Sequence, residues 1–146
     1  GAVTTHLMAE TLVPVCSPAL IAPRKKLTPQ QLAELPLLQQ STRPYTWREW
    51  FAARGLEVEG DMAGPRLELF SMLAEAAIHG MGVALVPPFL VQDELTRGLL
   101  VTVSKQAVPS GRSYFLIYPE RKAGSAALRA FGGWLQQQAG EVQRAA

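Results

Sequence analysis

The sequence predicts a layered α/β fold in which short strands and short helices alternate along the chain. Helix-start signals follow several apolar runs of strand length. One such run, Val83–Val86, contains no polar residue, as is typical of a strand covered on both faces. The chain has 146 residues, of which 48% are hydrophobic and 18% charged. A chain of this length and composition forms one domain, or two small lobes, with a sizeable core.

The N-terminal part of the chain predicts one strand and two helix starts. Leu12–Cys16 is an apolar run typical of a short buried strand, and Pro14 has no amide hydrogen to donate, which favours an edge or a bulge. Ser17–Pro18 is a helix-start signal. Thr28–Gln31 is a stronger one, because it combines a capping threonine, a proline in the first turn and a glutamine that completes a capping box.

The helix after this capping box is predicted to be short. Leu32 and Leu35 have the spacing of an inward face, and Pro36 ends the helix. Leu37–Gln40 then predicts the next strand, which ends in the polar stretch that follows it.

A second capping box, Thr46–Glu49, predicts the start of an aromatic helix. This helix presents Trp47, Trp50 and Phe51 to the core and stops at Gly55. The aromatic stripe is therefore interpreted as packing.

The clearest helix of the sequence follows a turn-rich segment at residues 60–65. Its apolar residues recur at helical spacing and are Leu69, Leu73, Ala76 and Ala77. Gly80–Gly82 ends it, because glycine accommodates a left-handed turn. The strand Val83–Val86, a short helix ending at Gly98 and the strand Leu99–Val103 then predict a βαβ unit.

The C-terminal part predicts a loop, a strand and a helix. Lys105–Arg112 is expected to be the loop and Ser113–Tyr118 the strand. Ser125 can cap the last helix. The apolar residues of that helix are Leu128, Phe131, Trp134 and Leu135. We expect the chain to fray through Gln143–Ala146.

Charge and cysteine content exclude several function classes. The formal net charge is +2, and the one basic cluster, Arg24–Lys26, is predicted to be a solvated loop rather than a phosphate-binding patch. Cys16 is the only cysteine, so neither an intrachain disulfide nor a cysteine metal cluster forms, and a reducing, cytoplasmic setting is expected. No apolar run approaches the roughly 18 residues that a membrane-spanning helix needs.

The sequence contains no pattern that predicts catalysis or a cofactor. Gly80–Gly82 lacks the third glycine of a dinucleotide loop and ends a helix instead of opening one. His6 and His79 have no neighbours at metal-ligand spacing, and no Gly-X-Ser-X-Gly segment occurs. We therefore predict no catalytic residue, no metal and no cofactor.

Six stretches, spread over nearly the whole chain, carry a resemblance to a known family. They are Leu12–Pro18, Gly64–Arg66 with Phe70–Ser71, Ala76–Pro87, Trp47–Trp50, Asp93–Leu95 with Gly98–Val101, and Tyr114–Pro119. As an ordered set they resemble the effector-binding domain of LysR-type bacterial transcriptional regulators, and especially its glycine-cleavage-activator subgroup.

The resemblance implies a fold like that of type II periplasmic binding proteins, with two α/β subdomains, two crossover strands and a small effector in the cleft. On that template, residues 1–10 are an N-terminal crossover remnant and residues 11–101 are the complete second subdomain. Residues 102–146 are then the returning strand-helix part of the first subdomain. The elements that open that subdomain, and a winged helix-turn-helix, are expected outside this sequence. The apolar faces left uncovered predict a homo-oligomer.

The expected effector site lies at the carboxyl ends of strands, where helix N-termini present free amides to anionic groups. Its residues are expected to be Gln40, Ser41, Thr42, Glu68, Leu69, Phe70, Ser71, Val86 and Pro87. Small carboxylates or amino-acid-like metabolites fit this chemistry and the family. In the alternative interpretation, Ser71 only solvates a helix turn and Phe70 belongs to the core.

The implied function is small-molecule sensing without catalysis, with DNA bound only through a domain outside this sequence. A solute-binding protein of a transport system shares the fold, but no secretion signal is visible in the sequence. An enzyme on the same fold is the third alternative. The upstream coding sequence distinguishes these three, because a helix-turn-helix indicates a regulator and a signal peptide indicates transport.

Overall fold

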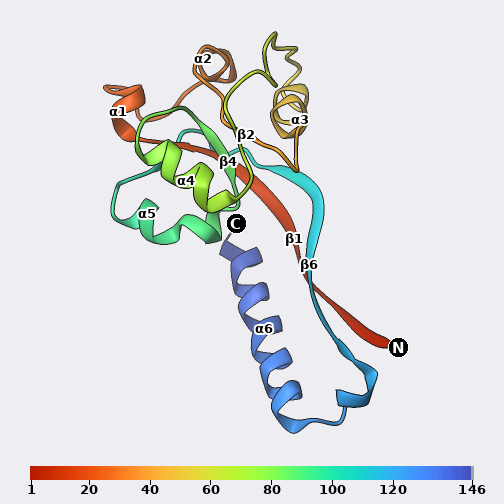
Figure 1. Cartoon of the computed structure of the whole chain (residues 1–146). Coiled ribbons are helices and arrows are strands. Elements are labelled where there is room, and N and C mark those ends of the chain that lie inside the picture. Colours follow the sequence, from red (N-terminus) through yellow and green to blue (C-terminus); the bar gives the residue numbers. More distant parts are fainter. Residues whose placement is uncertain (146) are drawn as a thin grey trace. The chain divides into compact units, whose positions relative to one another are not determined.

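Strands and helices alternate through the computed structural model, which describes residues 1–145 (Figure 1). In chain order the elements are β1 (Ala2–Cys16), α1 (Pro18–Ile21), α2 (Pro29–Ala33), β2 (Gln39–Gln40), α3 (Thr46–Ala52), β3 (Arg66–Leu67), α4 (Phe70–Ile78), β4 (Ala84–Val86), η1 (Pro88–Val91), α5 (Gln92–Thr96), β5 (Val101–Thr102), β6 (Val108–Pro119), η2 (Glu120–Lys122) and α6 (Ala126–Ala145).

The chain forms two compact units. Unit 1 comprises Gly1–Glu10 and Gly111–Ala146, and unit 2 comprises Thr11–Ser110. The long strands β1 and β6 each contribute residues to both units. The assignment of residues 11–101 and 102–146 to two family subdomains stays a prediction.

The strands of unit 2 belong to two sheets, one antiparallel and one parallel. β1 pairs antiparallel with β4 on one side and with β5 on the other, while β2 pairs parallel with β3. An isolated parallel bridge between Leu37 and Val83 joins the two sets of strands. The two strands of the predicted βαβ unit, β4 and β5, therefore run in the same direction, but β1 lies between them.

Pro14 does not lie at an edge of the sheet, so that prediction was wrong. It pairs with Leu85 of β4, and its carbonyl accepts a hydrogen bond of 3.1 Å from Val103 N next to β5. Because Pro14 has no N–H, the carbonyl of Val103 accepts its hydrogen bond from Leu27 N, at 3.0 Å. A proline is tolerated in this central strand because the acceptor opposite its missing N–H is satisfied from a loop.

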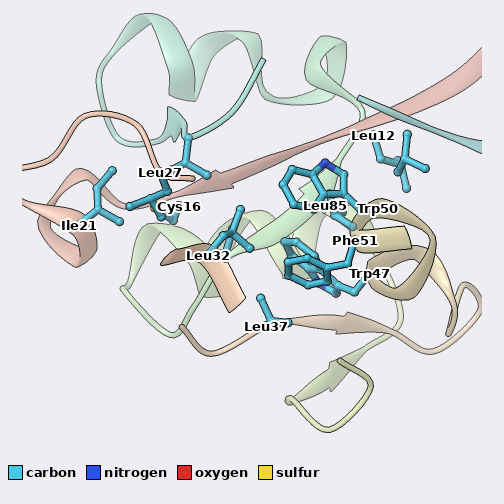
Figure 2. Packing of buried hydrophobic residues seen from close by; sticks show 13 residues of the cluster. Leu12, Cys16, Ile21, Leu27, Leu32, Leu37, Trp47, Trp50, Phe51 and Leu85 are labelled. Carbon is cyan, nitrogen blue, oxygen red and sulfur yellow. The ribbon is translucent and has the colours of Figure 1, made fainter. Parts of the chain in front are cut away.

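Successive residues of the central strands point to opposite faces of the sheet and fill two cores. Leu12, Cys16 and Leu85 pack on the face covered by α1, α2 and α3 (Figure 2). Their neighbours Val13 and Val15 pack on the other face, against α4 and η1. Burial on both faces confirms the interpretation of the apolar run at residues 83–86 as a doubly covered strand.

The two predicted capping boxes have different outcomes. At α2, Thr28 Oγ1 accepts a hydrogen bond from Gln31 N, and Thr28 N donates one to Gln31 Oε1, so the box is confirmed. At α3 the prediction was wrong, because Tyr45 is the N-cap residue and Thr46 already lies inside the helix. The Thr46 hydroxyl instead donates to the carbonyl of Arg43 at 3.2 Å. The Thr46 hydroxyl is therefore bonded to a backbone carbonyl of the preceding turn and does not cap the helix.

The strongest predicted helix is present as α4, but its first apolar residue was placed wrongly. Leu73 and Ala77 are buried as expected, whereas Leu69 is 58% exposed and is the N-cap residue. Leu69 has an extended backbone and so does not follow helical periodicity. Gly80, with φ of 79°, supplies the left-handed residue after the helix.

Unit 1 contains longer elements than the sequence predicts. β6 begins at Val108, inside the expected loop, because it pairs with β1. α6 continues through Ala145, so the predicted fraying from residue 143 was wrong within the described residues, and Ala146 lies outside them. Ser125 caps this helix as expected, since its Oγ accepts a hydrogen bond of 3.3 Å from Leu128 N. Of the helices in residues 1–145, none combines the length and the apolar character that crossing a membrane requires.

Candidate functional site

The candidate site lies at the carboxyl ends of β2 and β3, beside the start of α4. The parallel register pairs Gln39 with Arg66 and Gln40 with Leu67, so both strands end at the same edge of the sheet. α4 packs against these strands and against β4. The polar residues that follow β2 therefore lie next to the first turn of α4.

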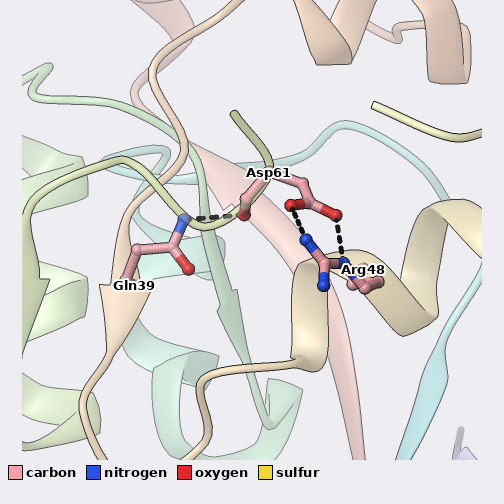
Figure 3. A network of polar contacts seen from close by, with 3 residues as sticks. All are labelled: Gln39, Arg48 and Asp61. Atoms are coloured by element: carbon pink, nitrogen blue, oxygen red, sulfur yellow. Dashed lines mark hydrogen bonds and ion pairs between the residues drawn. The ribbon is translucent and has the colours of Figure 1, made fainter. Parts of the chain in front are cut away.

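Buried polar contacts fix the position of β2. Trp47 Nε1 donates to the carbonyl of Leu38 at 2.9 Å, and Gln39 Nε2 donates to the carbonyls of Leu37 and Asp61, each at 3.0 Å. Asp61 in turn accepts a bidentate pair from Arg48, with Nε to Oδ2 at 3.0 Å and Nη2 to Oδ1 at 2.9 Å (Figure 3). This pair ties the loop around Asp61 to α3, and the Asp61 carboxylate raises the pKa of Arg48.

On the opposite face of β2, Gln40 connects three segments of the site. Its Nε2 donates to the carbonyl of Glu68 at 2.9 Å, and its Oε1 accepts a hydrogen bond of 3.1 Å from Arg43 Nη1. The guanidinium carbon of Arg43 lies 4.6 Å from the ring centroid of Phe70. Arg43 Nη1 also lies 3.5 Å from Thr42 Oγ1. A cation is thereby held at the end of β2, over the first residue of α4.

The first turn of α4 has no side-chain cap. Its N-cap residue, Leu69, uses its carbonyl to accept from Met72 N and Leu73 N, both at 3.1 Å, but it has no side-chain acceptor to offer. A helix start of this kind leaves amide hydrogens free, and the helix dipole adds partial positive charge there. The exposed hydroxyl of Ser71 in the same turn makes no hydrogen bond to another described residue. Two sources of positive potential, the Arg43 guanidinium and the start of α4, thus lie next to each other.

Seven of the predicted site residues lie together in this region. Ser41 N and Ser41 Oγ both reach the carbonyl of Leu67, at 3.0 and 3.4 Å, which places residues 40–42 beside residues 67–71. Val86 is the last residue of β4 and Pro87 follows it, but both are buried, and Val86 packs with Leu73 in the core under α4. The binding role of all nine residues stays a prediction.

Arg43 was missed by sequence reasoning, although it follows the predicted residues directly. The signal was available, because a site meant for an anion calls for a cation, and Arg43 is the first one after the strand. The polar stretch at residues 41–44, which contains Arg43, was interpreted only as the end of the predicted strand.

Other chemistry in the described residues is limited. Within residues 1–145, no three histidine, cysteine, aspartate or glutamate side chains are grouped so that they could hold a metal ion. Burial raises the pKa of the Cys16 thiol to about 11, in keeping with its predicted packing role.

Comparison with known proteins decides the family. The family model described as the LysR substrate binding domain matches residues 1–140. The chain belongs to the LysR substrate-binding domain family. The predicted resemblance is thus confirmed, and a solute-binding protein of a transport system is the less suitable interpretation.

Individual relatives agree with this assignment. The chain is 34% identical over 138 residues to the glycine cleavage system transcriptional activator of Escherichia coli K12, covering 94% of the chain and 45% of that protein. It is 32% identical over 130 residues to the transcriptional activator AmpR of Rhodobacter capsulatus, covering 89% of the chain and 43% of that protein. The chain therefore spans less than half the length of these curated relatives.

Solved structures show the same fold. The effector domain of the transcriptional regulator AmpR of Pseudomonas aeruginosa is 27% identical, with a TM-score of 0.82, and the match covers 99% of this chain and 68% of that one. The regulatory domain of CrgA, a LysR-type regulator from Neisseria meningitidis, is 19% identical with a TM-score of 0.69 and shares the fold. The type II periplasmic-binding-protein-like fold is confirmed by these matches.

Proposed function

We propose that this chain is the small-molecule-sensing part of a LysR-type transcriptional regulator, and that it binds an anionic effector through the end of β2 and the start of α4. The observation that carries the proposal is Arg43, held against Phe70 and Gln40 beside a helix start that has no cap. A carboxylate there would accept hydrogen bonds from free amides and from a guanidinium together. The effector class is therefore a small carboxylate, including amino-acid-like metabolites.

Each remaining predicted residue has a stated part in the proposal. Ser41, Thr42 and Ser71 supply hydroxyls, while Gln40 and the Glu68 carbonyl hold the cation and the strand ends in place. Leu69 and Phe70 present apolar surface beside the anion. Val86 and Pro87 are buried, so they would support the floor under α4.

The regulator as a whole would act by binding rather than by catalysis, in the bacterial cytoplasm. The relatives are transcriptional activators and regulators, which supports control of DNA binding by a domain outside this sequence. The chain itself has a formal net charge of only +2, which does not favour DNA binding. Titration of the chain with promoter fragments at physiological salt should therefore show no saturable, sequence-selective binding.

The experiment that tests the site is a calorimetric titration of the chain with a panel of small carboxylates and amino acids, each paired with its neutral amide. We expect at least one carboxylate to bind saturably and its amide to bind at least tenfold more weakly, since a charge-assisted hydrogen bond contributes about 1.5–3 kcal/mol. Equal binding of acid and amide, or no binding of any carboxylate in the panel, would contradict the proposal.

A further inference from the structure

A hollow in unit 2, lined by none of the residues of the effector proposal, combines apolar walls with three cations. Its volume is about 490 Å³, which lies within the range of roughly 300–1,000 Å³ typical of small-molecule sites. Arg24, Lys25 and Lys26 line it, and none of its lining residues is acidic. The basic cluster, expected from sequence to be only a solvated loop, thus borders a cavity.

The basic loop is anchored at both ends, so its charges stay beside the hollow. Arg24 N donates to the carbonyl of Ile21 at 2.9 Å, and Leu27 N donates to the carbonyl of Val103 at 3.0 Å. Lys26 Nζ donates to the carbonyl of Thr102 at 2.6 Å, which fixes that side chain along β5. The loop is therefore held against the strand whose residues form part of the wall.

The three cations have no carboxylate partner within the described residues. At the neighbouring helix α5, the one ion pair among the described residues joins Asp93 to Arg97, the C-cap residue, with Nη1 to Oδ2 at 3.3 Å. Three like charges close together in sequence repel one another and attract an anion. The loop thus supplies a positive potential that no acidic group of residues 1–145 neutralises by an ion pair.

The remaining walls decide what kind of anion fits. Pro18, Leu95 and Val101 line the hollow and are each half-buried, so they present apolar surface to whatever enters. A bare inorganic anion would leave this surface in water, whereas a neutral apolar molecule would not use the charge. We propose that this hollow is a second ligand site, which binds a monocarboxylate with an apolar body.

A second hollow of about 450 Å³ lies along the same loop and provides an internal comparison. It shares Arg24 but also includes Glu34, whose carboxylate opposes the entry of an anion. The arrangement of charge therefore favours the first hollow for an anionic ligand.

The test uses octanoate as the probe and two controls. Octanol has the apolar body without the charge, and inorganic phosphate has the charge without the apolar body. Octanoate is titrated into the chain labelled at leucine and valine methyl groups, and binding is followed by NMR. We expect saturable shifts at Leu95 and Val101, with octanol and phosphate each at least fivefold weaker. No saturable shift at these methyl groups, or equal binding of octanol, would overturn the proposal.

Variants separate this site from the effector proposal and from general attraction by charge. Arg24→Gln and Lys25→Gln leave the Lys26 anchor intact and should each weaken octanoate at least threefold. Arg129→Gln, on α6, is the matched control and should leave the affinity unchanged. Arg43→Gln should also leave the octanoate affinity unchanged, so the proposals for the two sites are tested independently. If Arg43→Gln or Arg129→Gln weakens octanoate as much as Arg24→Gln does, the proposal is wrong.

Discussion

The guanidinium of Arg43 lies over the ring of Phe70, 4.6 Å from its centroid, and also donates a hydrogen bond to Gln40 Oε1. A strand end and a helix start are therefore joined through one cation. Stacking on an aromatic ring orients the guanidinium, and its positive charge attracts an anion. Arg43 is thus the residue on which the proposed recognition of an anion most depends.

Replacing Arg43 should weaken carboxylate binding more than it weakens the fold. For Arg43→Gln we expect the affinity for the best carboxylate of the panel to fall tenfold or more, because a charge-assisted hydrogen bond contributes about 1.5–3 kcal/mol. Arg97→Gln, which removes an exposed cation from the C-cap position of α5, should leave the affinity within twofold. Calorimetry on both variants provides the comparison, and equal losses would point to overall charge instead of this site.

The two residues at the start of α4 should separate into a binding and a packing role. Ser71 has an exposed hydroxyl without a partner among the described residues, so Ser71→Ala should change stability by less than about 0.5 kcal/mol. Phe70 packs against both core clusters, so Phe70→Ala should cost about 3 kcal/mol or more. Urea unfolding and carboxylate titration of both variants measure this. A large loss of stability in Ser71→Ala would assign that residue to the fold.

Gly64 should be irreplaceable for a steric reason. A Cβ at this position would lie 1.7 Å from the carbonyl oxygen of Leu37, two residues before the start of β2. Because backbone cannot yield as a flexible side chain does, Gly64→Ala should destabilise the chain by about 3 kcal/mol or prevent folding. At Gly124 an added Cβ meets nothing within 4 Å, so Gly124→Ala is the matched control. Urea unfolding compares the two, and equal stability would show that β2 can move aside.

Local signals in the sequence predicted much of the fold. The capping box at Thr28 and the buried faces of α3 and α4 depend on residues within a few positions of one another. Pro14 could not be placed correctly, because its tolerance depends on Leu27 donating to Val103, two residues far apart in sequence. The extension of β6 likewise depends on pairing with β1. Local patterns do not contain such partners.

The candidate site could be predicted only as positions along the chain. Strand ends and a helix start gave residues 40–42 and 68–71, which the structure brings together. The position of Arg43 over Phe70 could not be predicted, because it depends on how residues 40–43 turn back, with Arg43 N donating to the carbonyl of Gln40. The apolar hollow beside Arg24 could not be predicted either, since Leu95 and Val101 lie beside the basic loop only in the folded chain.

The buried thiol of Cys16 predicts a loss of stability at high pH. Burial raises its pKa from the ordinary 9.0 to about 11. Below pH 9 the thiol is protonated in both the folded and the unfolded chain, and so has no effect on their balance. As pH rises further, the unfolded chain ionises first, so the folded state should lose at most about 3 kcal/mol by pH 11.

The variant Cys16→Ala isolates this effect from the titration of lysine and tyrosine. The difference in free energy of unfolding between the chain and the variant should be constant below pH 9 and then shrink as pH rises. The thiol of the native chain should also react slowly with a disulfide reagent until the chain is unfolded. A difference that stays constant up to pH 11, together with fast labelling, would show that Cys16 is accessible.

Unit 1 presents apolar surface on β6 and on α6, which predicts self-association of this chain. Phe131 and Trp134 of α6 stack with ring centroids 6.1 Å apart, yet they are 50% and 55% exposed. On β6, Phe115 and Ile117 are 50% and 63% exposed. An added Cβ on Gly132 would lie 3.2 Å from Leu116, so α6 packs on the face of β6 opposite to Phe115 and Ile117. Both apolar surfaces are therefore open within the described residues.

Covering large apolar side chains stabilises a complex by roughly 1.5–3 kcal/mol each, so we expect a dimer or higher oligomer. The double variant Phe131→Ser and Trp134→Ser should shift the chain towards monomer, as measured by light scattering, with an unchanged circular dichroism spectrum. Met81→Ser removes an equally exposed apolar side chain, 49% accessible, from unit 2 and should leave the mass unchanged. A well-folded monomer of the 146-residue chain at its highest soluble concentration would refute association through these faces.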